Sequence, residues 1–142
     1  MMVPLALGIS AVLLFLATVH LYWAAGGGAG AAGAVPEVDG APAFVPRTID
    51  TLAVALALTL GALVVLGRAG LWTPGWTAPL VFRGGVWLLS VVFLFRSIGD
   101  FRLVGFFKRI RGTRFARRDT LFYSPLCFLL GVALLRLALL DP

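Results

Sequence analysis

Ionisable and aromatic side chains gather in this sequence at the ends of long apolar runs. His20 closes the first run, and a second polar group lies between the third and fourth runs. An imidazole can act as an acid, a base or a hydrogen-bond donor, and a guanidinium binds phosphate or carboxylate in bidentate fashion. The pattern therefore predicts a ligand-binding region made of His20, Tyr22, Trp23, Arg96, Asp100, Arg102, Lys108, Arg114, Asp119 and Tyr123.

Charge pairing within this region is expected because isolated charges are costly at membrane depth. Arg96 and Asp100 stand four residues apart, which favours an ion pair if one helix carries both. A charged side chain at the centre of a bilayer costs roughly 2.5 to 3.5 kcal/mol on insertion scales, so such groups usually pair or face a polar interior. We therefore expect His20, Arg96, Asp100, Arg102 and Asp119 to converge on one polar cavity.

The sequence has few side chains that could bind a metal ion or act as a nucleophile. His20 is the only histidine, and the lone Cys127 lies within an apolar run. This composition excludes di-iron desaturase sites and bis-histidine haem ligation, leaves a haem with one axial histidine open, and predicts no metal site. Ser124 precedes Pro125 near the start of the fourth run, which favours a helix entry or kink over a catalytic serine. The sequence leaves open the cofactor and whether the protein is an enzyme.

The elements that position these residues follow from composition. The chain has 142 residues, of which 61% are hydrophobic and 13% charged, whereas roughly 25% are charged in soluble domains. A helix of roughly 20 apolar residues crosses the hydrocarbon core of a bilayer. Four stretches reach that length, so we predict an all-α integral membrane bundle of four transmembrane helices in a single domain, 1–142; the spans are 3–23, 48–67, 79–95 with a few flanking residues, and 120–140.

The connections between these spans differ in character. Residues 24–47 are rich in glycine without the lysine of a phosphate-binding loop, which predicts a flexible connection. The short turn at 68–78 makes spans two and three antiparallel neighbours in an up-down bundle. In the third connection, apolar residues at helical spacing alternate with cations, which predicts a short amphipathic helix over 101–111 lying in the headgroup plane; its apolar positions are Leu103, Phe106, Phe107 and Ile110.

Orientation is predicted from the distribution of cations. Four passes place the first and third connections on one side of the membrane, and that side carries nine of the 12 Lys and Arg residues. The other side, with both termini, carries only Arg68, Arg83 and Arg136. The positive-inside rule then puts the connections in the cytoplasm and the termini outside.

Several short motifs resemble a known protein family. They are His20-Leu-Tyr-Trp-Ala, the glycines of 26–33 with Pro36, Gly99-Asp100-Phe-Arg102, Gly105-Phe-Phe-Lys108 and Tyr123-Ser-Pro-Leu126, together with Arg96, Thr113, Phe115-Ala116 and Asp119. Together they cover nearly the whole chain, which resembles a bacterial family of small four-span membrane proteins classed as a domain of unknown function. The resemblance implies a multi-pass protein of the bacterial inner membrane and brings no activity.

Two classes of function fit these observations. The first is a protein that binds an anionic lipid headgroup or another anionic amphiphile at its basic polar end. The alternative is a membrane enzyme acting on a lipid or isoprenoid-like substrate, with His20, Asp100 or Asp119 as acid or base, or else a structural subunit of a membrane complex. Membrane lipids are the expected partners, and an oligomer or complex partner stays open. Nucleic acid is excluded, because six of the 12 cations lie at 108–118 between two apolar runs.

Overall fold

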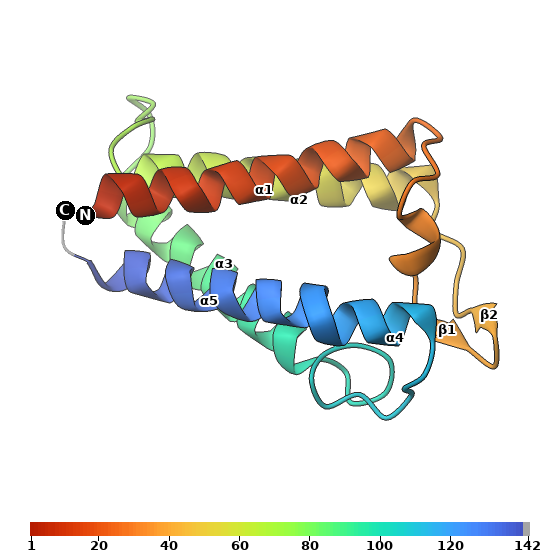
Figure 1. The fold of residues 1–142 in the computed structure, drawn as a ribbon. Coiled ribbons are helices and arrows are strands. Elements are labelled where there is room, and N and C mark those ends of the chain that lie inside the picture. The colour runs from red at the N-terminus through yellow and green to blue at the C-terminus, as the bar shows by residue number, and fades with distance from the viewer. Residues whose placement is uncertain (141–142) are drawn as a thin grey trace.

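Four long helices make up most of the computed structural model, which describes residues 1–140 (Figure 1). They are α1 (Met2–Ala24), α2 (Thr48–Arg68), α3 (Pro79–Ile98) and a last helix formed by α4 (Arg114–Arg118), a π turn (Asp119–Tyr123) and α5 (Ser124–Leu139). All four are long and apolar enough to cross a membrane. The predicted all-α fold with four candidate membrane spans is therefore confirmed, and the chain is a multi-pass membrane protein.

The helices are arranged as two pairs. Helix α1 packs along α2, α3 packs along α5, and α2 also contacts α3 after their short connection. The beginning of α1 and the end of α5 lie at one end of the molecule, and the first connection and α4 lie at the other (Figure 1). This arrangement gathers the first and third connections at the same end, as the up-down topology requires.

Small and hydroxyl-bearing residues line the contacts within each pair. The Ser10 hydroxyl donates to the Ala62 carbonyl at 3.3 Å between α1 and α2, and the Ser90 hydroxyl donates to the Gly131 carbonyl at 2.8 Å between α3 and α5. Large apolar side chains such as Phe15 point outward and are exposed. Close packing inside and an apolar exterior are the pattern of helices that associate in lipid.

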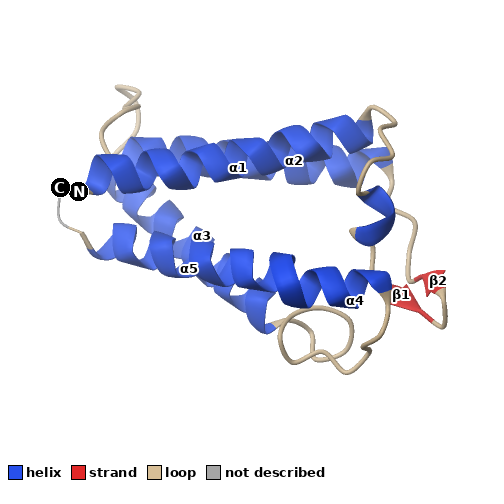
Figure 2. Ribbon diagram, in the orientation of Figure 1, coloured by secondary structure: helices blue, strands red, loops and turns tan. Residues whose placement is uncertain are grey.

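The segment between α3 and α4 contradicts the predicted amphipathic helix over 101–111. It contains turns and bends and no helix, as Figure 2 shows. Gly99 and Gly105 both have positive φ, and their backbones approach so closely that a Cβ on Gly105 would lie 2.2 Å from the Ile98 carbonyl oxygen. The apolar spacing alone was misleading, because these two glycines and Phe101, also at positive φ, favour a compact loop.

The fourth helix begins six residues earlier than the predicted residue 120. Thr113 is its N-cap, and the Thr113 hydroxyl accepts a hydrogen bond from the Ala116 N–H at 3.0 Å. Such a cap satisfies one of the free N–H groups in the first turn. The helix then runs without interruption from Arg114 to Leu139.

The first connection has defined structure rather than being only a glycine-rich linker. It contains the 3-10 turn η1 (Ala31–Gly33) and a hairpin of β1 (Glu37–Val38) with β2 (Ala41–Pro42), in which Glu37 pairs with Pro42. Both η1 and β1 contact α4. The connection therefore folds back over the end of the bundle and encloses part of the polar region.

Candidate functional site

A buried carboxylate, Asp119, is the centre of the polar end. It lies in the π turn between α4 and α5 and is 0% exposed. Its Oδ1 accepts from Arg96 Nη2 at 2.9 Å. Its Oδ2 accepts from Lys108 Nζ at 2.9 Å, from the Gly105 N–H at 2.8 Å and from the Ser124 hydroxyl at 3.1 Å. Four donors from three chain segments thus meet on one side chain, and we call Arg96, Gly105, Lys108, Asp119 and Ser124 the Asp119 network.

Lys108 is the more unusual cation of this network. It is the only lysine in the chain and is just 2% exposed, whereas the side chain of Arg96 is 34% exposed. Besides Asp119, the Lys108 ammonium donates to the Gly105 carbonyl at 2.8 Å. A buried ammonium is tolerated only when it is paired and hydrogen-bonded. Lys108 therefore serves as an internal anchor that holds the loop to the helix ends.

Asp100 closes the same loop from its other side. Its Oδ1 accepts from the N–H groups of Arg102, Leu103 and Val104 at 2.9, 2.7 and 3.0 Å. Partial burial raises the pKa of Asp100, but these backbone donors outweigh that effect and hold its pKa below the usual value. The carboxylate is thus charged at neutral pH and fixes the first turn of the loop.

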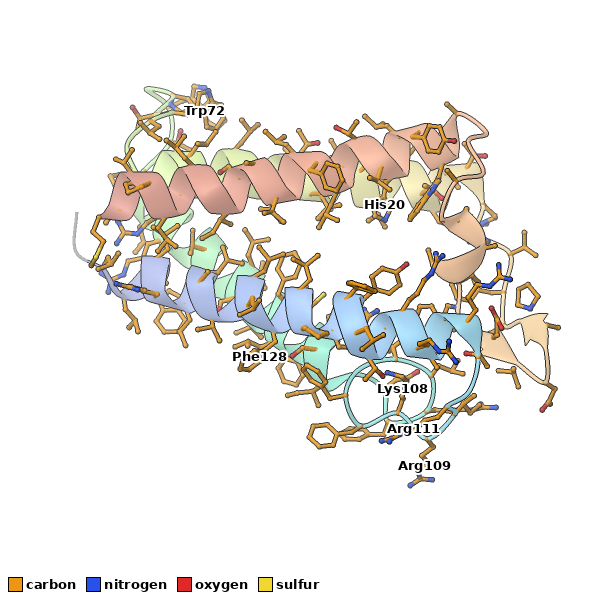
Figure 3. All side chains as sticks on the ribbon, in the orientation of Figure 1. His20, Trp72, Lys108, Arg109, Arg111 and Phe128 are labelled. Carbon is orange, nitrogen blue, oxygen red and sulfur yellow. The ribbon has the colours of Figure 1, made fainter. Side chains whose placement is uncertain are left out.

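The outer side of this loop carries aromatic and basic side chains. We call Phe101, Arg102, Phe107, Arg109 and Arg111 the basic loop face; all five are exposed, and the rings of Phe101 and Phe107 lie 6.3 Å apart. Figure 3 shows Arg109 at the outer edge of the loop and Lys108 nearer to α4. The loop therefore turns one cation inward and presents three outward beside two phenyl rings.

A cavity of about 860 Å³ lies at the same end of the bundle, lined by parts of α1, α2, α4 and the first connection. His20 points toward it from α1 (Figure 3), and its Nδ1 lies 2.8 Å from the Leu16 carbonyl oxygen. Since a carbonyl can only accept, Nδ1 carries the proton in the neutral ring and Nε2 is left as an acceptor. The His20 ring also meets Trp23 edge to face at 5.2 Å. The remaining polar lining residues are Glu37, Asp50, Thr51 and Arg114.

The profile of one protein family, described as "Protein of unknown function (DUF3995)", matches residues 13–134. The chain belongs to DUF3995. This confirms the resemblance to a family of unknown function that the motifs indicated. Neither the curated proteins nor the solved structures contain a match to the chain. In this DUF3995 member the matched stretch includes the Asp119 network, the basic loop face and the cavity.

The ten predicted site residues of this DUF3995 chain do not share one cavity, so the predicted convergence of His20, Arg96, Asp100, Arg102 and Asp119 is wrong. Three of the ten belong to the Asp119 network and two to the loop around Asp100. Three line the cavity, namely His20, Trp23 and Arg114. The last two, Tyr22 and Tyr123, bond the first connection through Ala29 and Gly33.

The predicted ion pair between Arg96 and Asp100 is also not formed. Helix α3 ends at Ile98, and Gly99 turns the chain with φ 89°, so Asp100 no longer lies one helical turn after Arg96. Arg96 instead pairs with Asp119, 23 positions further along the chain. The Asp100 carboxylate instead accepts hydrogen bonds from backbone N–H groups of the loop.

Two groups of the polar end were missed from sequence. Ser124 joins the Asp119 network because the π turn brings positions 119 and 124 together, a spacing that an ordinary helix does not favour. Glu37 reaches the cavity because the hairpin folds back onto α4. The five-residue spacing of Asp119 and Ser124 gave no signal, because it depends on the π turn. The up-down topology placed Glu37 at the polar end, in the connection 24–47, but no motif assigned it to a site.

Proposed function

We propose that this protein binds the headgroups of anionic lipids with its basic loop face, in the inner membrane of a bacterial cell. The supporting observation is the construction of the loop: Lys108 is buried against Asp119, whereas Arg102, Arg109 and Arg111 are exposed beside Phe101 and Phe107. A loop held by a buried ion pair loses little conformational freedom when it binds. The arrangement suits a surface that meets lipid phosphates.

The chemistry of the exposed residues fits this assignment. Guanidinium groups bind phosphate oxygens in bidentate fashion, and each cation near an anionic leaflet contributes about 1 kcal/mol. Phenyl rings at the same level pack against the upper acyl chains. Arg102, Arg109 and Arg111 together therefore supply about 3 kcal/mol of preference for anionic over zwitterionic lipid at low salt.

The alternative of a membrane enzyme has less support. Asp119 is fully buried, and both of its oxygens accept hydrogen bonds from donors of the protein. Asp100 is exposed, but its Oδ1 accepts from three backbone N–H groups, which gives it a role in fixing the loop. Of the three candidate acids and bases, only His20 faces a cavity, and it has no second titratable partner at hydrogen-bond distance among residues 1–140.

Removing two cations of the basic loop face should weaken anionic-lipid binding by about 30-fold. Arg102→Gln/Arg109→Gln deletes two exposed charges worth about 1 kcal/mol each. The measurement is native mass spectrometry of the detergent-solubilised protein with equal amounts of phosphatidylglycerol and phosphatidylcholine. Arg83→Gln/Arg136→Gln is the matched control, because it removes two exposed arginines at the other end. Equal loss in the two double variants would refute the assignment to this face.

The same proposal places the basic loop face in the cytoplasm. Alkaline phosphatase fused to either terminus should be active, because the termini lie outside the cell. In a Cys127→Ala background, Arg109→Cys on the loop should react with a membrane-impermeant maleimide only after the cells are opened, since Arg109 is exposed on the cytoplasmic side. Labelling of intact cells would reverse the orientation.

A further inference from the structure

The cavity of about 860 Å³ has the size and lining of a site for an amphiphile. Ligand sites in proteins are typically roughly 300 to 1,000 Å³ and are mostly apolar with a few polar groups. Here the apolar part is contributed by residues such as Val35, Phe44 and Val54, and polar groups come from α1, α2, α4 and β1. The cavity is separate from the basic loop face, which shares no residue with it.

Of the charged side chains that line the cavity, one anion and one cation are left without an ion-pair partner among residues 1–140. Asp50 is neutralised by Arg47 through two hydrogen bonds of 2.9 Å. Glu37 and Arg114 also line the cavity, and within residues 1–140 neither takes part in an ion pair or a side-chain hydrogen bond. Glu37 and Arg114 therefore offer opposite charges to the same cavity without forming an ion pair with each other. Such a lining is complementary to a zwitterionic ligand, in which a cationic and an anionic group are separated.

The third polar group defines which cationic group fits. Because Nδ1 of His20 donates to the Leu16 carbonyl, Nε2 of the neutral ring is an acceptor that a ligand donor can satisfy. A primary ammonium offers three N–H donors, enough to donate to both Glu37 and His20. A trimethylammonium offers none, so a choline headgroup would donate to neither acceptor.

The position of the cavity fixes the source of the ligand. It lies at the last turns of α1 beside Trp23, a residue type typical of the headgroup level, and Thr51 and Val54 extend its wall along the apolar helix α2. A lipid seated here would place its headgroup in the cavity and its acyl chains along α2.

We infer that this cavity binds a zwitterionic phospholipid with a primary ammonium headgroup, of the phosphatidylethanolamine type, with its phosphate at Arg114 and its ammonium at Glu37 and His20. This site differs in ligand and in residues from the anionic-lipid surface of the basic loop face. The two therefore respond to different substitutions.

Binding of phosphatidylethanolamine and phosphatidylcholine to the full chain in detergent tests this site, again by native mass spectrometry. Phosphatidylethanolamine should bind at least about tenfold more tightly, because only its ammonium donates hydrogen bonds to the two acceptors. Glu37→Gln should reduce this preference at least about fivefold, and Arg114→Gln should weaken both lipids, since both carry the phosphate. Asp39→Asn and Arg117→Gln are matched controls on exposed neighbours that do not line the cavity.

A cavity-filling variant keeps the test decisive if a charge change disturbs the fold. Val54→Trp should abolish phosphatidylethanolamine binding while the helix content and the phosphatidylglycerol binding of the basic loop face stay unchanged. Equal binding of the two zwitterionic lipids, or an unchanged preference in both Glu37→Gln and Val54→Trp, would overturn the inference. Loss of phosphatidylglycerol binding in Arg102→Gln/Arg109→Gln with unchanged phosphatidylethanolamine binding would support two separate sites.

Discussion

Asp119→Asn should destabilise the protein by about 3 to 5 kcal/mol, the cost of breaking a buried ion pair by removing one partner. The substitution keeps the shape of the side chain but removes its charge. Lys108, 2% exposed, then loses the one anionic partner that it has among residues 1–140. It also replaces one acceptor oxygen by an NH₂ group, which is a hydrogen-bond donor. In one orientation of the amide this NH₂ group faces the donor Arg96, and in the other it faces the donors Lys108 and Gly105 N–H. The measurement is equilibrium unfolding in mixed micelles, followed by circular dichroism.

Asp39→Asn is the matched control for this prediction, because Asp39 is exposed and its φ of 50° is one that asparagine tolerates. Its effect should stay within about 0.5 kcal/mol. The double variant Asp119→Leu/Lys108→Met should recover part of the stability lost in Asp119→Leu, since it removes the uncompensated charge as well. Similar stabilities for Asp119→Asn and Asp39→Asn would show that the network does not hold the fold.

The spans were predictable because bilayer thickness sets their length. The expected spans at 3–23 and 48–67 correspond to Met2–Ala24 and Thr48–Arg68. The third span, predicted at 79–95 with a few flanking residues, corresponds to Pro79–Ile98. The fourth helix was predicted too short because hydropathy detects only its apolar part. Its first turns, Arg114–Arg118, are mostly charged, and their signal was the capping threonine Thr113.

The loop and the polar end were harder to predict because their contacts are long-range or depend on backbone conformation. The helical spacing of Leu103, Phe106, Phe107 and Ile110 indicated a helix. That prediction did not take into account Gly99 and Gly105, whose positive φ angles allow the compact loop. Lys108 was placed in the correct polar region, yet its burial depends on Asp119 from another segment. The single-domain organisation, the orientation and the binding residues themselves stay predictions.

Helices α3 and α5 approach each other closely at Gly131. A Cβ at this position would lie 2.6 Å from Leu94 Cγ and 3.1 Å from the Leu94 backbone nitrogen, so it would displace more than the tip of a flexible side chain. The Ser90 hydroxyl donates to the Gly131 carbonyl at 2.8 Å and depends on the same short separation. In lipid the hydrophobic effect does not drive apolar helices together, so the association of α3 with α5 depends on close packing and on such hydrogen bonds.

Gly131→Leu should therefore cost about 2 to 3 kcal/mol of stability, because overpacking forces α3 and α5 apart and weakens the Ser90 hydrogen bond. Gly84→Leu is the matched control: Gly84 lies in α3, and no atom lies within 4 Å of a Cβ placed there. That change adds the same side chain on the lipid-facing exterior, where leucine is a better helix former than glycine, so stability should stay equal or rise slightly. Unfolding in mixed micelles measures both variants. If Gly131→Leu were as stable as Gly84→Leu, α3 and α5 would not depend on their contact at Gly131.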